Sequence, residues 1–170
     1  MIDLAVVKKI SNGHGSFSIW REGDIDDTSI IQEEVNKLHG RAIFIGYNAS
    51  ADILPFQNFH KTHVGGRDGW LAESIGRHPV LRGAYMTDFF KGDYAVQETG
   101  VENSSETIQK NLEILNKEIA IFEKDKPVLI TFGDKTFNLI KSLGFDPKYL
   151  PHYARHGLTK NEFCRLVNEI

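Results

Sequence analysis

Apolar and polar positions along the chain follow helical and strand spacings in alternation. The segment TSIIQEEVNKLH, residues 28–39, places three apolar side chains on one helical face, and Gly40 is expected to end this helix. RAIFIGY, residues 41–47, is an apolar run of the kind found in buried parallel strands. The pattern therefore predicts a helix followed directly by a core strand.

The rest of the chain continues this alternation. The longest helix is predicted over residues 103–124, with Asn103 and Glu106 spaced as a capping box. Asp134 is expected to cap a later helix, and Gly144 to end it. The other predicted elements are a helix over 66–79, strands over 83–90 and 127–133, a last helix over 158–170, and SFSIW, residues 16–20, as a candidate added strand.

Strands and helices of these lengths predict an α/β fold, a three-layer α/β/α sandwich around a mainly parallel sheet. The length of 170 residues fits a single domain, with residues 28–170 as its core and residues 1–27 as an N-terminal extension or added strand. The N-terminus lacks an apolar segment long enough for a secretion signal, and no apolar run approaches a membrane span. We therefore expect a soluble, cytoplasmic protein.

Charge and cysteine content limit the function classes. The formal net charge of −3 gives no basic footprint for long duplex contacts, so any nucleic-acid contact must be local. The single cysteine, Cys164, excludes a disulfide within the chain and any cysteine-only zinc or iron–sulfur site. His60 and His63 form the best candidate metal pair, but no third ligand is evident nearby, so neither a metal nor another cofactor is expected.

Polar residues follow the predicted strands at the point where ligands bind in open parallel sheets. Such sheets bind ligands beyond the carboxyl ends of their strands. Asn48 and Asp88 lie at two such ends, and His152 lies in a short fourth segment, KYLPHYARHG, so an amide, a carboxylate and an imidazole are expected to meet at one edge. Each also has a simpler interpretation, because polar residues at strand ends commonly cap turns and helices.

Five segments, in order, resemble motifs of the uracil-DNA glycosylase superfamily. IFIGYNAS resembles its first motif, an apolar strand ending in Gly, any residue, then Asp or Asn. HVGGRDGWL and TDFFK resemble the Gly-Arg-Ala-Gly helix start and the Thr-Asn-Val-Val-Lys strand of its thermostable bacterial and archaeal branch. VLITFGDKTFNLI resembles the third strand and helix, and LPHYARHG lies where the second motif, His-Pro-Ser, would lie. The resemblance covers roughly residues 40–158 and implies a uracil-DNA glycosylase-like fold with DNA as the partner.

The resemblance implies specific roles. Asn48 would position the attacking water, and His152 would donate a hydrogen bond to the departing base. Asp88 occupies the position of the residue that reads the base. The stacking ring would come from His63, with Phe59 and Phe56 as competitors. The other first-motif residues that would line the base site are Gly46, Tyr47 and Ser50. The bulk of Tyr47 could bar a base with a 5-methyl group.

Three departures from the family pattern stand out. The iron–sulfur cluster of the nearest branch is excluded by the cysteine count. The family reads uracil with an asparagine, whereas an ionised Asp88 only accepts hydrogen bonds, so it would prefer a base presenting a donor or be held protonated by burial. HYAR replaces His-Pro-Ser, and a phosphate contact is expected instead from Arg155, with Lys91 and Arg67 from neighbouring loops.

The sequence thus predicts a DNA N-glycosylase that hydrolyses a deaminated or damaged, uracil-like base from DNA. The alternative is a catalytically inactive module that binds a nucleobase or nucleotide on the same fold, which Asp88 and the altered second motif favour. A third hypothesis is a pathway protein whose partner occupies the cleft.

Overall fold

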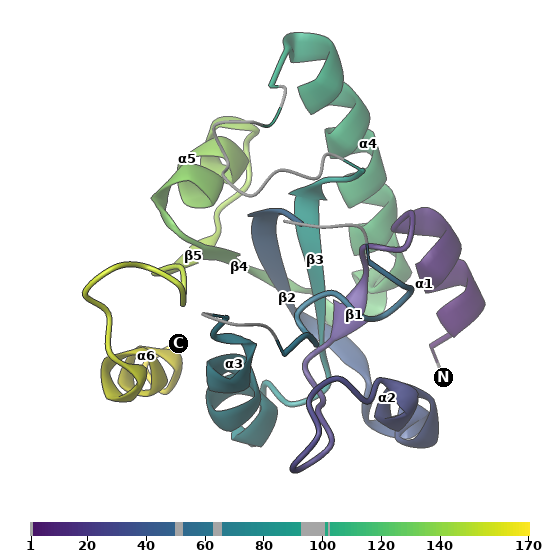
Figure 1. Ribbon diagram of the computed structural model, residues 1–170. Helices are drawn as coiled ribbons and strands as arrows, with labels where there is room; N and C mark the ends of the chain where they lie inside the picture. The colour runs from purple at the N-terminus through teal and green to yellow at the C-terminus, as the bar shows by residue number, and fades with distance from the viewer. Residues whose placement is uncertain (1, 50–52, 63–65, 93–100, 102) are drawn as a thin grey trace.

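The computed structural model describes residues 2–49, 53–62, 66–92, 101 and 103–170. It shows a five-stranded sheet with helices on both sides (Figure 1). The helices are α1 (Leu4–Ile10), α2 (Ser29–Glu33), α3 (Asp68–Ser74), α4 (Ser105–Ile121), α5 (Asp134–Ser142) and α6 (Lys160–Val167), with 3-10 turns at Val35–Lys37, Ile75–Arg77 and Glu123–Asp125. The strands are β1 (Ser16–Phe17), β2 (His39–Asn48), β3 (Ala84–Phe90), β4 (Val128–Phe132) and β5 (Lys148–Leu150).

The strand order is β1-β3-β2-β4-β5, with β2 at the centre. β1 runs antiparallel to β3, and the other neighbouring pairs are parallel. The register places Gly46 opposite Asp88, while Phe132 on β4 pairs with Leu150 on β5. The carboxyl ends of four parallel strands therefore lie along one edge of the sheet, where this kind of fold binds ligands.

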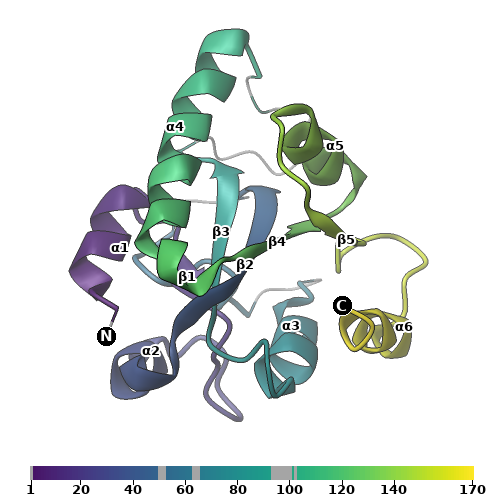
Figure 2. The same ribbon diagram turned by 180° about the vertical axis from the view of Figure 1, so that it is seen from behind.

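Each face of the sheet packs against its own set of helices. Ile43 and Ile45 of β2 belong to a core cluster that includes residues of α1, α2, α4 and α5. Phe44, one position along, belongs to a second cluster with residues of α3 and α6. Figures 1 and 2 show α3 and α6 on one side of the sheet and α1 and α4 on the other. Because side chains alternate along a strand, Gly46 and Asn48 belong to the face that carries Phe44.

The predicted mixed α/β architecture with a mainly parallel sheet is confirmed, and all three predicted core strands are present. The helix predicted over 28–39 is wrong in length, because α2 ends at Glu33 and is followed by a 3-10 turn. Leu38 already has extended dihedral angles, so β2 begins at His39, before the glycine expected to end the helix.

Two predicted helix caps are also wrong. The side chain of Ser104, one residue beyond the expected Asn103, accepts the backbone N–H of Thr107 at the start of α4. Gly133, with φ of +83°, occupies the N-cap position of α5, and Asp134 is instead the first helical residue. There its carboxylate lies close to the positive end of the helix dipole.

The N-terminal segment is part of the packed structure. α1, which the sequence pattern did not predict, is capped by Asp3 and buries Val7. The added strand predicted over residues 16–20 is confirmed at Ser16–Phe17, which form β1 and pair with β3. Among the described residues, no helix has both the length and the apolar character to cross a bilayer.

Candidate active site

Asp88 is buried at the carboxyl edge of the sheet, beside a glycine that makes room for it. Asp88 is only 3% exposed to solvent. A Cβ placed on Gly46 would lie 2.1 Å from Asp88 Oδ1 and 3.4 Å from Phe59 Cζ. A side chain at Gly46 would therefore displace the carboxyl group. Gly46, expected to line a base site, instead accommodates the Asp88 carboxyl.

The environment of Asp88 opposes its charge. Burial raises the pKa of its carboxyl from 3.8 to about 6, and the negative charges of Glu118 and Asp68 act in the same direction. A hydrogen bond from Asn58 and the positive charge of Lys91 oppose this increase. Near neutral pH the carboxyl can therefore change protonation state with modest changes in pH or in its surroundings.

Asn58 ties Asp88 to the N-terminal segment. Its Nδ2 donates to Asp88 Oδ2 at 2.8 Å and to the backbone carbonyl of His14 at 2.9 Å. His14 is itself buried, and its Nε2 accepts the backbone N–H of Gly92 at 2.9 Å. The orientation of the Asp88 carboxyl thus depends on the loop between α1 and β1, which sequence reasoning left outside the core.

Asn48 is half-buried at the end of β2, on the same face as Gly46. Its side-chain NH₂ donates to the backbone carbonyl of Ala49 at 3.0 Å. This bond fixes which side of the amide carries the carbonyl oxygen, the group that would orient a water.

Phe59, one of the aromatic residues expected to stack on a base, lies beside Asp88 next to Gly46. It is 6% exposed, lies 6.2 Å from Phe132 between ring centroids, and has φ of +65°, an uncommon conformation for a bulky residue. Trp20 Nε1 donates to its carbonyl at 3.0 Å and helps to hold that conformation. Phe56 also has positive φ, but it packs against the other core cluster.

Tyr47 points to the opposite face of the sheet from Asn48. It is 7% exposed, packs 4.9 Å from Phe90 and lies under Lys135, whose Nζ is 4.7 Å from the ring centroid. It belongs to the core cluster of α4 and α5. The expectation that Tyr47 would bar a 5-methyl group is therefore wrong, because neighbouring strand residues face opposite sides.

His152 follows β5 and is held in one ring orientation. Its Nδ1 accepts the backbone N–H of Ala154 at 3.1 Å, and its ring stacks on Tyr153 with centroids 4.6 Å apart. The residue is exposed overall, but surrounding protein lowers the pKa of the imidazole. The ring is therefore neutral at pH 7. Because Nδ1 accepts a hydrogen bond, the ring proton is on Nε2, which can donate a hydrogen bond.

Tyr153 connects His152 with the Asp88 region. Its ring lies 5.6 Å from Phe132, which in turn lies close to Phe59. Burial, with the charges of Asp68 and Asp88 and a hydrogen bond to Asp68, raises the pKa of the Tyr153 hydroxyl well above its usual value. The hydroxyl stays protonated and can act only as a neutral donor or acceptor.

The structure corrects the expected role of Lys91. Its side chain is 1% exposed, and its Nζ lies 3.1 Å from Glu118 Oε2, whose side chain is fully buried. Lys91 also donates to Thr87 Oγ1 at 2.8 Å and to the backbone carbonyl of Asp88. An ammonium group enclosed in this way cannot reach a DNA phosphate.

Arg67 is likewise committed to the protein. Its NH1 lies within hydrogen-bonding distance of three backbone carbonyls, and its guanidinium carbon lies 4.5 Å above the Trp70 ring. Arg155 is exposed, so of the three cations expected to contact phosphate it alone has an open side chain.

Two expected site residues, Ser50 and His63, lie outside the described residues. His60, the expected metal partner of His63, is fully buried against Trp20, with its Nε2 2.9 Å from the Phe17 carbonyl oxygen. Burial lowers the pKa of its imidazole to about 4. Within the part of the chain that the structure describes, no group of three or more metal-ligating side chains could hold an ion.

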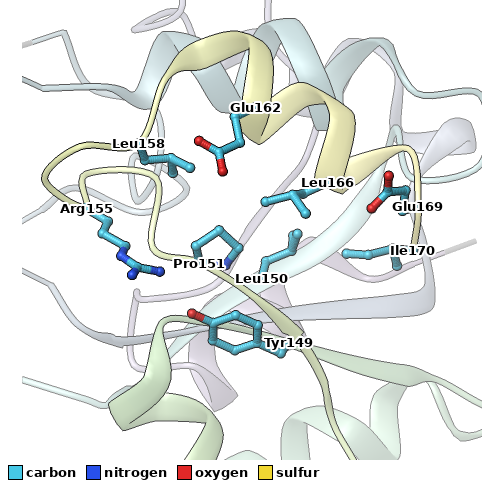
Figure 3. Close-up of a pocket in the computed structure, with 9 residues that line it drawn as sticks. All are labelled: Tyr149, Leu150, Pro151, Arg155, Leu158, Glu162, Leu166, Glu169 and Ile170. Carbon is cyan, nitrogen blue, oxygen red and sulfur yellow. The ribbon is translucent and has the colours of Figure 1, made fainter.

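A cavity of about 260 Å³ lies between β5 and α6, beside the loop that carries His152 (Figure 3). Its wall is mainly apolar, and Glu162 extends from α6 toward its interior (Figure 3). Arg155 is the one expected site residue that lines it. The complete lining is Tyr149, Leu150, Pro151, Arg155, Leu158, Glu162, Leu166, Glu169 and Ile170.

Sequence reasoning missed Asn58, Asp68 and Tyr153. Asn58 lies in a loop without periodicity, so no pattern could place its amide on Asp88. The other two had a usable signal, because Asp68 and Tyr153 occupy the positions of alanine and proline in the resembled motifs.

We compared the chain with models of known protein families, with curated proteins and with solved structures, and nothing matched.

Proposed function

We propose that this protein is a DNA N-glycosylase of the uracil-DNA glycosylase type, which hydrolyses the bond between a deaminated or damaged base and its sugar. The observation that carries the proposal is the set of groups at the carboxyl edge of the sheet. Asn48, Asp88 and His152 supply an amide, a buried carboxyl and a neutral imidazole at the ends of parallel strands. Phe59 adds an aromatic ring beside Asp88.

These groups match the demands of the reaction. Breaking an N-glycosidic bond creates positive charge on the sugar and negative charge on the departing base. The amide carbonyl of Asn48 would position water near the anomeric carbon without removing a full proton. The Nε2–H of His152 would donate to a base oxygen as charge develops there, for which a neutral ring suffices.

Asp88 would set the preference for the base. As a carboxylate it accepts two hydrogen bonds and matches a base edge that presents N–H or amino donors. As a neutral acid it also donates, and could then contact a carbonyl such as that of uracil. With a pKa of about 6, the carboxylate form dominates at pH 7.5, so we expect a donor-presenting base to be favoured there.

The alternative function is binding of a nucleobase or nucleotide without catalysis. The observation that favours it is the enclosure of the cations expected to hold DNA. Lys91 is buried against Glu118 and Arg67 faces backbone carbonyls, which leaves Arg155 for phosphate. A ligand smaller than DNA would not need those contacts.

A panel of oligonucleotides separates the two functions. End-labelled single and double strands carrying uracil, hypoxanthine, xanthine or a mismatched thymine are incubated with the protein and then treated with alkali. Asn48→Ala should lower the cleavage rate by at least about 10²-fold, because a misplaced water forfeits the effect of positioning. Asn116→Ala, an exposed asparagine on α4, is the matched control and should cleave like the parent.

Cleavage at one base that Asn48→Ala abolishes and Asn116→Ala preserves would establish the activity and name the substrate. Binding of a nucleobase or nucleotide by calorimetry, with no cleavage at high protein excess, would instead support the binding module.

A further inference from the structure

We propose that Arg67 is a positioning residue for His152, which it serves by clamping the loop that carries the imidazole. This inference rests on the proposed function, in which His152 supports the departing base. Arg67 comes from the segment that starts α3, and the loop runs from β5 to α6, so the clamp joins two parts of the chain that are far apart in sequence.

The geometry of the clamp is specific. NH1 of Arg67 lies 3.2 Å from the carbonyl oxygen of Tyr153, 3.2 Å from that of Arg155 and 3.4 Å from that of Leu158. Backbone carbonyls of a loop need partners, and a single cation facing three of them holds the loop in one curvature. The guanidinium also lies over Trp70, which fixes the direction of the side chain.

The clamped loop sets the state of the imidazole. The N–H of Ala154, inside the clamped stretch, donates to His152 Nδ1, and the N–H of Arg155 donates to the His152 carbonyl at 2.8 Å. If the loop opened, the bond to Nδ1 would be lost and the proton could occupy either ring nitrogen. Arg67 thereby determines, through the backbone, whether Nε2 is the donor.

A second contact supports the loop from the same helix start. Asp68, adjacent to Arg67, is buried and lies close enough to Tyr153 to raise the pKa of its hydroxyl, while the Tyr153 ring stacks on His152. In the resembled motif a proline follows the histidine and stiffens the chain by itself. Here the rigidity comes from contacts made by Arg67 and Asp68.

The test uses two substitutions of Arg67 in the full chain. Arg67→Met keeps an apolar stem that can pack on Trp70 but removes all donors, whereas Arg67→Lys keeps three donors. Arg67→Met should lower kcat by about 10²-fold and leave KM within about threefold, since the loss concerns the transition state. Arg67→Lys should recover most of the lost kcat. Arg77→Met, at an exposed arginine in the turn after α3, is the matched control and should behave like the parent.

A role in phosphate binding gives the opposite split. It predicts that Arg67→Met raises KM and leaves kcat unchanged. It also predicts that the slope of log DNA affinity against log salt concentration becomes shallower by about one. A role in folding alone predicts that kcat per folded molecule, with the folded fraction taken from thermal melts, is the same in Arg67→Met and the parent. Either of these results would overturn the proposal.

Nitrogen NMR of the His152 ring tests the clamp without turnover. In the parent, Nδ1 should be unprotonated and Nε2 protonated, and Arg67→Met should give a mixture of tautomers that Arg67→Lys reverses. If the parent cleaves no oligonucleotide, the glycosylase proposal fails while this spectrum still decides the clamp. An unchanged tautomer in Arg67→Met would reject the clamp whatever the activity.

Discussion

At the scale of single residues, Asp88 connects stability with the proposed base preference. Burial raises the pKa of its carboxyl from 3.8 to about 6, so the folded state holds this proton more tightly than the unfolded chain does. The Asp88 contribution to stability is therefore complete below pH 4 and is lost as pH rises through about 6. Asp88→Asn, which keeps an acceptor for Asn58, should raise the free energy of unfolding at pH 7.5 by up to about 3 kcal/mol.

Urea unfolding of the parent and Asp88→Asn at pH 4 and pH 7.5 measures this effect. The variant should gain stability at the higher pH and little at the lower one. The amide can also donate to O4 of uracil and accept from N3–H, so the same variant should process uracil faster relative to donor-presenting bases. Equal stabilities of the two proteins at pH 7.5 would show that water reaches the carboxyl.

The sequence predicted the position of a site residue where that residue lies at the end of a strand. Asn48 and Asp88 were expected at strand ends, and the register places them on neighbouring strands. Tyr47, expected at the base site, faces the opposite side of the sheet because side chains alternate along β2. Asn58 could not be predicted, because its contact with Asp88 depends on the path of an irregular loop.

At the scale of elements, a buried ion pair fastens α4 to the end of β3. Lys91 follows β3, and Glu118 lies on α4, where its Oε1 accepts from Tyr85 at 2.7 Å and Thr87 at 2.9 Å. Removing one member leaves a buried charge without its counterion. Lys91→Met should therefore lower the free energy of unfolding by about 3–5 kcal/mol.

The double variant Lys91→Met with Glu118→Gln tests the cause. The glutamine removes the stranded charge but can still accept from Tyr85 and Thr87, so it should recover at least half of the loss. Urea titrations with unchanged m-values would show that only stability has changed. A loss below about 1 kcal/mol in Lys91→Met would mean that the ammonium is hydrated in solution.

The elements themselves followed the hydrophobic pattern where the pattern was long. The three core strands and the α4 helix were predicted because apolar runs and helical faces of this length are distinctive. α1 was missed because seven residues give few helical repeats and only Val7 is buried. The caps were misplaced because several polar residues precede each helix and only the backbone geometry selects one of them.

At the scale of the whole molecule, the mainly parallel sheet was predictable from the sequence. Which charged side chains at its carboxyl edge are buried was not. Alternating strands and helices imply that the carboxyl ends of the parallel strands lie along one edge of the sheet, and Asp88 and His152 lie at the ends of two of these strands, β3 and β5. Which cations remain exposed there depends on packing between distant segments. Lys91 and Arg67 have the same charge, yet one is enclosed by α4 and the other faces the loop after β5.

The charge distribution predicts that the affinity for DNA depends only weakly on salt concentration. The formal net charge is −3, and of the three cations expected at the edge only Arg155 is exposed. Each phosphate contact contributes about −0.7 to −0.9 to the slope of log affinity against log salt. A fluorescent oligonucleotide with an abasic site should therefore give a slope of about −1 to −2 in anisotropy titrations across potassium chloride.

Arg155→Met should reduce that slope by about one and weaken binding similarly for every sequence, because a phosphate contact carries no base information. Arg165→Met, at an exposed arginine of α6 that pairs with Glu169 beyond the helix end, is the matched control and should leave the slope unchanged. A parent slope steeper than about −4 would mean that other cations of the chain approach the DNA. In that case the enclosure of Lys91 and Arg67 would no longer argue for a ligand smaller than DNA.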